Sequence, residues 1–145
     1  MNIDNKSYKI AAAHISHERV GVDVVILDLE LGHYYSTTGV GTVAWEFLVA
    51  GCGQRECAEL LSRRFPTIPL SKIGLDLSTF VKSCLDFGLI VEGELIEGRV
   101  NIEDPCGEVE LEYVAPEIKR YTDLEDLLRI DPIHEVTPEG WPVKS

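Results

Sequence analysis

Two of the four cysteines, Cys52 and Cys57, lie only five residues apart. Thiolates a few residues apart bind zinc when histidines or further cysteines complete the coordination. Cys52 sits in a glycine-rich turn, however, and no Cys/His pair with the spacing of a zinc finger completes the site. The sequence therefore predicts neither a metal nor any other cofactor.

Histidine chemistry has no better support. His134 lies between Asp131 and Glu135, a combination suited to acid–base catalysis, but nothing fixes a nucleophile or oxyanion donors near it. His14 and His17 are three apart in a predicted strand, so we expect their side chains on opposite faces. These patterns predict a protein that is not an enzyme.

The cysteines also bear on the compartment. Four of them, at positions 52, 57, 84 and 106, are too few and too scattered for a secreted disulfide framework, so we expect reduced thiols. The N-terminus lacks a charged start followed by an apolar run, and no stretch approaches the roughly 18 apolar residues that span a bilayer. We expect a cytoplasmic protein with no membrane contact.

Charge restricts the partners. The 145 residues include 13 Lys+Arg against 25 Asp+Glu, which gives a formal net charge of -12. Such a chain repels phosphate backbones and anionic lipids at long range. A hydrophobic content of 45% is enough for one core but not for two. We therefore expect one domain with an appendage, and no nucleic-acid partner.

The elements that position any site begin with strands. Residues 22–29 are rich in β-branched and apolar side chains, which predicts a strand. Gly32 supplies a turn, and residues 33–36 form a short returning strand. A weaker strand is expected within residues 10–20. Together these predict a three-stranded antiparallel sheet.

Three helices follow the sheet. The first is expected to start at Thr37 or Thr38 as cap and to run to about Ala50. The second covers about residues 54–65, and the third begins with Ser71 as cap and ends at Gly88. A further strand resumes at residues 89–91.

This order predicts an α+β fold with a winged helix-turn-helix-like plan, in which a three-stranded antiparallel sheet is followed by three helices and a C-terminal extension. The expected division is a loose N-terminus at 1–9, a domain at 10–92 and the extension at 93–145. Winged helices usually bind DNA through the third helix. Here that helix carries two lysines balanced by two aspartates, whereas a DNA reader needs a basic stripe.

Residues 24–91 resemble the PqqD-like family, the leader-peptide chaperones of ribosomally synthesised and post-translationally modified peptides (RiPPs), whose fold is also called the RiPP recognition element. The resemblance covers a little under half of the chain. It departs from the family at residues 36–39, where relatives usually have Leu-Asn, and in continuing for about fifty residues beyond the family's usual end. The motifs that carry it are Leu29-Glu30-Leu31-Gly32-His33-Tyr34-Tyr35, Val43-Ala44-Trp45-Glu46-Phe47, Asp76 with Phe80, and Gly88-Leu89-Ile90.

The resemblance implies non-catalytic binding of a precursor leader peptide and its delivery to a separately encoded modifying enzyme. Residues 33–36 would form a sheet edge to which the peptide adds as a strand, and its alternate side chains would enter the groove beside the third helix. An exposed edge also makes a homodimer possible. The expected peptide-binding residues are His33, Tyr34, Tyr35, Ser36, Lys72, Asp76, Thr79, Phe80 and Ser83.

Simpler interpretations of these residues stay open. Strand alternation must send Tyr34 or Tyr35 into the core, and Phe80 is equally consistent with a core residue. Lys72 and Asp76 are four apart on a helix and can be a surface ion pair alone. The main functional alternative is an acidic winged-helix protein-interaction domain that acts in transcription regulation.

The C-terminal extension has its own pattern. Residues 92–112 are acidic and alternate enough to predict one or two added strands, and Thr122 to Glu125 form a capping box for a short helix near 123–130. Residues 113–145 are too apolar to stay uncovered in water. Three roles compete: packing across the sheet or groove as an intramolecular occupant, docking on a modifying enzyme, or serving as a fused substrate peptide.

Overall fold

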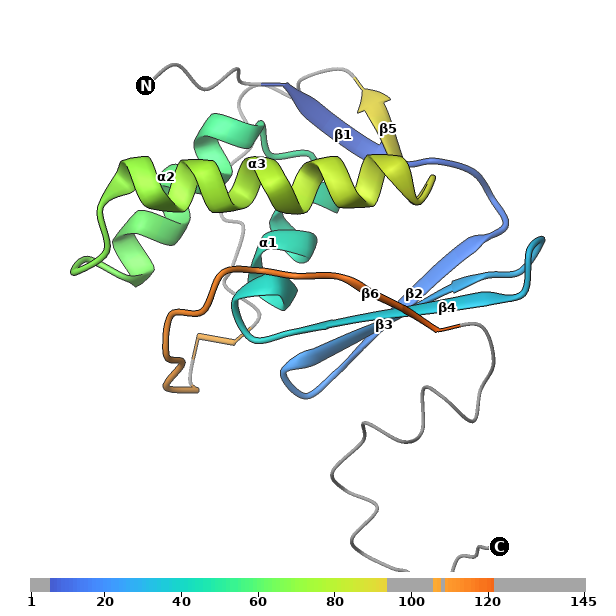
Figure 1. Cartoon of the computed structure of the whole chain (residues 1–145), viewed down its shortest axis with the longest axis horizontal. Coiled ribbons are helices and arrows are strands. Elements are labelled where there is room, and N and C mark those ends of the chain that lie inside the picture. Colours follow the sequence, from blue (N-terminus) through green and yellow to red (C-terminus); the bar gives the residue numbers. More distant parts are fainter. Residues whose placement is uncertain (1–5, 94–105, 108, 122–145) are drawn as a thin grey trace, which may run out of the picture.

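The structure is a computed structural model that describes residues 6–93, 106–107 and 109–121. In these residues it contains two antiparallel sheets and three helices (Figure 1). The elements in chain order are β1 (Ser7–Ile10), β2 (Ile15–Val20), β3 (Asp23–Asp28), β4 (His33–Thr38), α1 (Val40–Val49), α2 (Gln54–Arg64), α3 (Leu70–Asp86), β5 (Ile90–Gly93) and β6 (Lys119–Tyr121).

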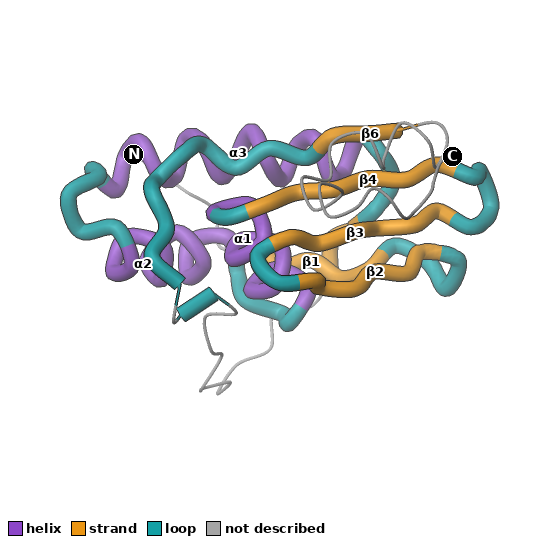
Figure 2. The backbone as a smooth tube through the Cα atoms, turned by 90° about the horizontal axis from the view of Figure 1, so that it is seen from below, coloured by secondary structure: helices purple, strands orange, loops and turns teal. Residues whose placement is uncertain are grey.

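The larger sheet has the strand order β2-β3-β4-β6, and the smaller one pairs β1 with β5. Figure 2 shows the larger sheet at one end of the molecule and the helices at the other, with α3 beside the β4–β6 edge. The α+β, winged helix-turn-helix-like fold is confirmed. The larger sheet contains the three expected strands, β2, β3 and β4, together with a fourth, β6. The β1-β5 pair forms a second sheet that the sequence did not predict.

The β2-β3-β4 meander follows from its residues. Apolar side chains alternate along β3, where Val24 and Ile26 are buried and face the helices. The turn into β4 is held by Asp28, whose Oδ1 accepts hydrogen bonds of 3.0 Å from the backbone N–H groups of Glu30 and Leu31. Gly32 then adopts a φ of 76°, as its place in the sequence predicts.

Two predicted helix caps are wrong. Thr37 and Thr38 lie in β4, and the residue before α1 is Gly39, with a φ of 60°. The Thr37 hydroxyl is engaged instead with a distant carbonyl described below. Ser71 is likewise inside α3, which begins after Pro69, because the fixed φ of proline suits the entry to a helix.

The N-terminal strand is a second difference. Residues 7–9, expected to be loose, form β1 with Ile10 and pair with β5. The reason is burial: Ser7 and Tyr8 are almost fully covered, and the Tyr8 hydroxyl donates to Gln54 Oε1 at 3.3 Å. A strand that covers the core at this end is stabilised although its sequence is polar.

A single core joins the sheets to the helices. Trp45 of α1 is completely buried at its centre, and its Nε1 donates a 3.2 Å hydrogen bond to His17 Nδ1. The apolar stripe of α3 packs there too, as predicted, and Gly88 ends that helix with a φ of 75°.

The helix predicted near 123–130 lies outside the described residues, and so does most of 92–112, where one or two added strands are predicted. Of that stretch, residues 92–93 belong to β5 and residues 109–112 are not strand. The division at residues 10–92 and 93–145 stays a prediction. Among the described residues, no helix is both long enough and apolar enough to cross a membrane.

Candidate functional site

β4 is not an edge strand. Residues 119–121 return from the C-terminal part of the chain and pair antiparallel with it, with Tyr34 opposite Tyr121, Tyr35 opposite Arg120 and Ser36 opposite Lys119. The expectation of an open edge at residues 33–36 is therefore wrong. The signals in residues 119–121 were too short and too charged to indicate a strand, and only the pairing with β4 makes them one.

Residues 109–121, called here the tail segment, run past α2, along α3 and onto β4 (Figures 1 and 2). For residues 113–121 this path agrees with packing across the sheet or groove, the first of the three roles considered for residues 113–145, of which 122–145 lie outside the described residues. We call the side chains and backbone that hold it the tail-binding surface, contributed by the end of α2, one stripe of α3 and β4.

The inward side chains of the tail segment fall into two pairs, Leu111 with Tyr113 and Pro116 with Ile118. Ile118 is 6% exposed and belongs to the core, Pro116 is buried, and Leu111 and Tyr113 are partly buried against the core. Val114 between them is 65% exposed. Within each pair the spacing of two is that of an extended chain with one face down, and the pattern shifts by one residue between the pairs, where Val114 and Ala115 are both exposed.

Tyr113 makes the polar anchor of the segment. Its hydroxyl donates a 2.7 Å hydrogen bond to Asp76 Oδ2, and its ring meets that of Phe65 edge-on, with 5.3 Å between centroids. Lys72 Nζ lies 5.9 Å from the Tyr113 ring and 3.0 Å from Asp76 Oδ2. Burial, reinforced by the bond to Asp76 and by its charge, raises the pKa of Tyr113.

Arg64, at the end of α2, holds the entry to the tail segment. Its Nη2 donates to the carbonyl oxygens of Cys106 and Val109, at 2.8 and 2.5 Å. Such charge-assisted bonds to main-chain carbonyls fix the path of the backbone whatever side chains it carries.

Thr37 holds the middle of the segment. Its Oγ1 donates a 2.7 Å hydrogen bond to the carbonyl oxygen of Glu117. Gly41, the second residue of α1, leaves the room for this contact: a Cβ at that position would collide with Thr37 Oγ1 and lie 3.5 Å from the Glu117 carbonyl oxygen. The glycine is required by close approach, since its φ is not positive.

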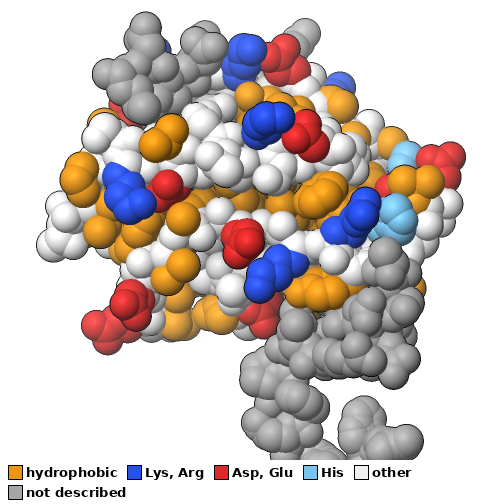
Figure 3. Space-filling view, viewed as in Figure 1, with side chains coloured by type: hydrophobic (Ala, Val, Ile, Leu, Met, Phe, Trp, Pro, Cys, Tyr) orange, Lys and Arg blue, Asp and Glu red, His pale blue; other side chains and the backbone are white. Residues whose placement is uncertain are grey.

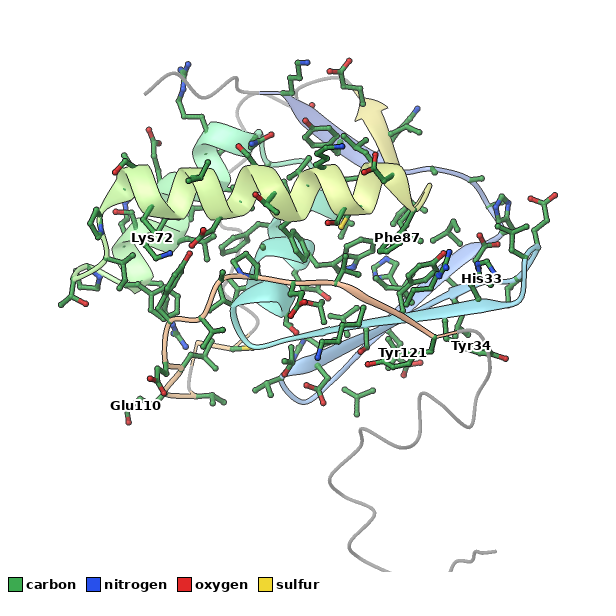
Figure 4. All side chains as sticks on the ribbon, viewed as in Figure 1. His33, Tyr34, Lys72, Phe87, Glu110 and Tyr121 are labelled. Atoms are coloured by element: carbon green, nitrogen blue, oxygen red, sulfur yellow. The ribbon has the colours of Figure 1, made fainter. Side chains whose placement is uncertain are left out.

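The last contacts lie at the end of α3. The Arg120 guanidinium carbon is 5.8 Å from the centre of the Phe87 ring, and that ring packs on Tyr35 with 5.1 Å between centroids. Burial raises the pKa of Tyr35 and the Asp28 charge adds to the rise, while Arg120 lowers it. Figure 4 shows Phe87 reaching from α3 toward the sheet, and Tyr121 beside Tyr34.

The structure distributes the nine predicted site residues over three environments. Tyr35 and Phe80 are core residues. Five are half-buried, namely His33, Tyr34, Ser36, Asp76 and Ser83, and Lys72 and Thr79 are exposed. Of the strand residues, Tyr34, Tyr35 and Ser36 pair with β6. On α3, positions 72, 76, 79 and 83 share one face by their spacing. Asp76 and Lys72 contact the tail segment, whereas the Thr79 hydroxyl donates to the Leu75 carbonyl.

Sequence reasoning missed part of this surface, namely Thr37, Arg64, Phe65 and Phe87. Phe87 follows Ser83 at a spacing of four, and Thr37 follows Tyr35 at a spacing of two, so both could have been found by extending the helix and strand periods. Nothing in the sequence singles out Arg64 or Phe65, because their role depends on where the tail segment passes.

The stripe of α3 beside this surface is electrically balanced. Lys82 pairs with Asp86 at 3.1 Å, as Lys72 does with Asp76. In Figure 3, hydrophobic side chains show where the tail segment meets α3, with charged side chains of both signs on either side. This face presents no basic stripe for a phosphate backbone.

The cysteines are core residues, and Cys106 lies at the entry to the tail segment, where Arg64 bonds its carbonyl oxygen. All four are buried. Burial raises the pKa of Cys84 to about 12 and that of Cys57 well above its ordinary value. In the described part of the chain, no group of three or more His, Cys, Asp or Glu side chains is placed to hold a metal ion.

Comparison with known proteins gives a structural likeness. No family model matches the sequence, and no curated protein matches it. Among solved structures, the chain is similar to TbiB1, which was determined in complex with the TbiA(beta) leader peptide. The two are 22% identical, the match covers 64% of this chain and 99% of TbiB1, and the TM-score is 0.53. The likeness shows a shared fold.

Proposed function

We propose that this protein binds the leader of a precursor peptide in RiPP biosynthesis and delivers it, without catalysing a reaction itself, to a separately encoded modifying enzyme in the cytoplasm. One observation carries the proposal: an extended segment of chain already lies on β4 and α3, paired antiparallel with β4 and with Leu111, Tyr113 and Ile118 packed into or against the core. A surface that holds one extended peptide has the shape to hold another.

The free energies of strand pairing, side-chain burial and peptide ordering together predict a moderate affinity for the leader peptide. Strand addition supplies backbone hydrogen bonds worth about 0.5–1.5 kcal/mol each, and each buried aliphatic anchor adds about 1.5–3 kcal/mol. Ordering a flexible peptide costs about 2–5 kcal/mol. The remainder corresponds to dissociation constants in the micromolar range or somewhat below.

The comparison adds support of its own. TbiB1, which shares this fold, is a protein whose structure contains a leader peptide. We therefore assign peptide binding to the backbone of His33 to Ser36 and to the α3 stripe of Lys72, Asp76, Thr79 and Ser83. Tyr35 and Phe80 support this surface from the core. Pairing of two copies through a sheet edge, giving a homodimer, is part of the same proposal.

Titration with fluorescent leader peptides encoded beside this gene tests the proposal. We expect saturable binding that a proline in the paired stretch of the leader abolishes, because proline lacks the N–H that strand pairing needs. On the protein, Ser83→Arg introduces a bulky cation into the α3 stripe and should weaken binding at least tenfold. Ser71→Arg, the same replacement at an exposed position of α3, is the matched control.

The opposite result is equally clear. A folded protein that binds none of these peptides, but binds a component of the transcription machinery, points to the acidic winged-helix alternative. Equal weakening by Ser83→Arg and Ser71→Arg would mean that the peptide binds away from the α3 stripe.

A further inference from the structure

We propose that the tail segment is a built-in occupant of the peptide-binding surface, which excludes other peptides until it is displaced. This inference rests on the proposed function, because it concerns the regulation of the same site. Its premise is that residues 109–121 and a bound leader need the same backbone edge and the same side-chain positions.

The backbone edge can serve one strand at a time. β3 pairs with one edge of β4, and β6 pairs with the other through Tyr34, Tyr35 and Ser36. Each N–H and C=O group on that edge is directed to one neighbouring strand. An incoming peptide must therefore replace β6 to reach β4.

The side-chain positions are also taken. Ile118 fills the core position opposite Thr37, Arg120 covers Phe87, and Tyr113 bonds Asp76. The middle of the segment is tied down as well, since Thr37 Oγ1 donates to the Glu117 carbonyl. A peptide whose alternate side chains enter this surface meets an occupied site along its whole length.

The contacts of the segment are of a kind that can be released. β6 has three residues, and most other contacts are single hydrogen bonds or ring contacts at the surface of the core. Ile118 and the neighbouring Pro116 are the buried apolar residues among residues 109–121, and Ile118 is the larger anchor. The β2-β3-β4 meander and the helices form most of the core without it, so they can stay folded when the segment leaves.

Occupation from the same chain has a predictable effect on affinity. A tethered ligand acts at an effective concentration on the order of millimolar when its linker is short and flexible. The apparent dissociation constant for a competing peptide equals the intrinsic constant divided by the fraction of protein whose surface is open. Weakening the anchor should therefore tighten the binding of any peptide added in solution.

The experiment uses a fluorescein-labelled synthetic peptide of residues 109–121 as probe, titrated into the full chain by fluorescence anisotropy. Ile118→Ala removes the anchor from the chain while the probe keeps its own isoleucine. We expect the variant to bind the probe at least tenfold more tightly than the wild type. Val114→Ala, an aliphatic truncation at an exposed position of the same segment, should behave as the wild type does.

A second variant keeps the test sound if Ile118→Ala proves unfolded by circular dichroism. Tyr113→Phe removes only the hydroxyl that bonds Asp76, and we expect severalfold tighter binding of the probe. A folded Tyr113→Phe or Ile118→Ala chain that binds the probe no better than the wild type overturns the proposal. So does a failure of the probe to bind any folded chain, since a segment with no affinity of its own cannot compete.

The same titrations separate this proposal from the function. If the probe binds Ile118→Ala tightly but no neighbouring leader peptide binds either chain, the occupant is real and the leader-binding function is wrong. If leaders bind wild type and Ile118→Ala equally, the function stands and the exclusion is wrong. A leader that pairs with the outer edge of β6 instead would bind Ile118→Ala more weakly than the wild type, which also overturns the exclusion.

Discussion

The Tyr113 hydroxyl donates a 2.7 Å hydrogen bond to the Asp76 carboxylate, across a sequence separation of 37 residues. Burial and that carboxylate raise the pKa of Tyr113, so the folded state favours the neutral phenol. The resulting stability is fully present below the ordinary tyrosine pKa of about 10 and is lost as pH rises through the higher value in the folded protein.

This relationship predicts that the wild type is more stable than Tyr113→Phe at pH 8 and that the difference shrinks above about pH 10. Urea unfolding of both proteins at each pH measures the two free energies. Lys72, whose Nζ lies 5.9 Å from the centre of the Tyr113 ring, is present in both proteins, so its effect largely cancels in the comparison. A difference that grows with pH would contradict the assigned bond.

Thr37→Val should lower the free energy of unfolding by about 1–3 kcal/mol, because it leaves the Glu117 carbonyl without its donor. Valine keeps the shape and the β-propensity of threonine, so the loss reports the hydroxyl. Chemical denaturation measures the change. Thr38→Val is the control: the Thr38 hydroxyl is exposed and bonds Asp23, so its loss should cost only a few tenths of a kcal/mol.

Gly41→Ala should destabilise the protein, although the same change inside a helix usually stabilises by about 0.5–1 kcal/mol. The new Cβ collides with Thr37 Oγ1, and the threonine must turn away from Glu117. Because both changes break the same hydrogen bond, Gly41→Ala combined with Thr37→Val should cost less than the sum of the two single changes. Full additivity would show that Gly41→Ala destabilises the protein through a contact other than the hydrogen bond between Thr37 and Glu117.

Cys106 should report the release of the tail segment. It is 2% exposed, and the Arg64 guanidinium bonds its carbonyl. At pH 8 a thiol reagent should modify the wild type slowly, since all four thiols are buried and the pKa of Cys84 is raised to about 12. Ile118→Ala should gain one fast-reacting thiol, which Cys106→Ala in the same background removes. Equal rates in wild type and Ile118→Ala would contradict this.

The hairpin and the helices could be predicted because their signals are local. Alternation along β3, Gly32 at its turn and the apolar stripe of α3 each specify an element within a few residues. The helix starts were less predictable. Thr37 has the composition of a cap, but its hydroxyl bonds Glu117, 80 residues away, and no local rule contains that partner.

The residues of the candidate site also divide into those that local sequence patterns predict and those that depend on distant partners. Lys72, Asp76 and Ser83 follow from the helical period and from the resemblance to leader-binding proteins, whereas Arg64 and Phe65 acquire a role only when the tail segment passes over them. Residues 119–121 are too few and too polar to indicate a strand. They become one because β4 offers unpaired backbone groups and Ile118 gains a buried position.

By itself, the sequence determined an acidic α+β domain and the strand and helix that border the tail-binding surface, because periodicity and charge are properties of neighbouring residues. Only the tertiary structure decided that this surface is occupied by the chain's own residues 109–121. Strand pairing and burial are settled between segments far apart in the sequence, and the energy of each contact depends on a partner that the segment itself does not contain.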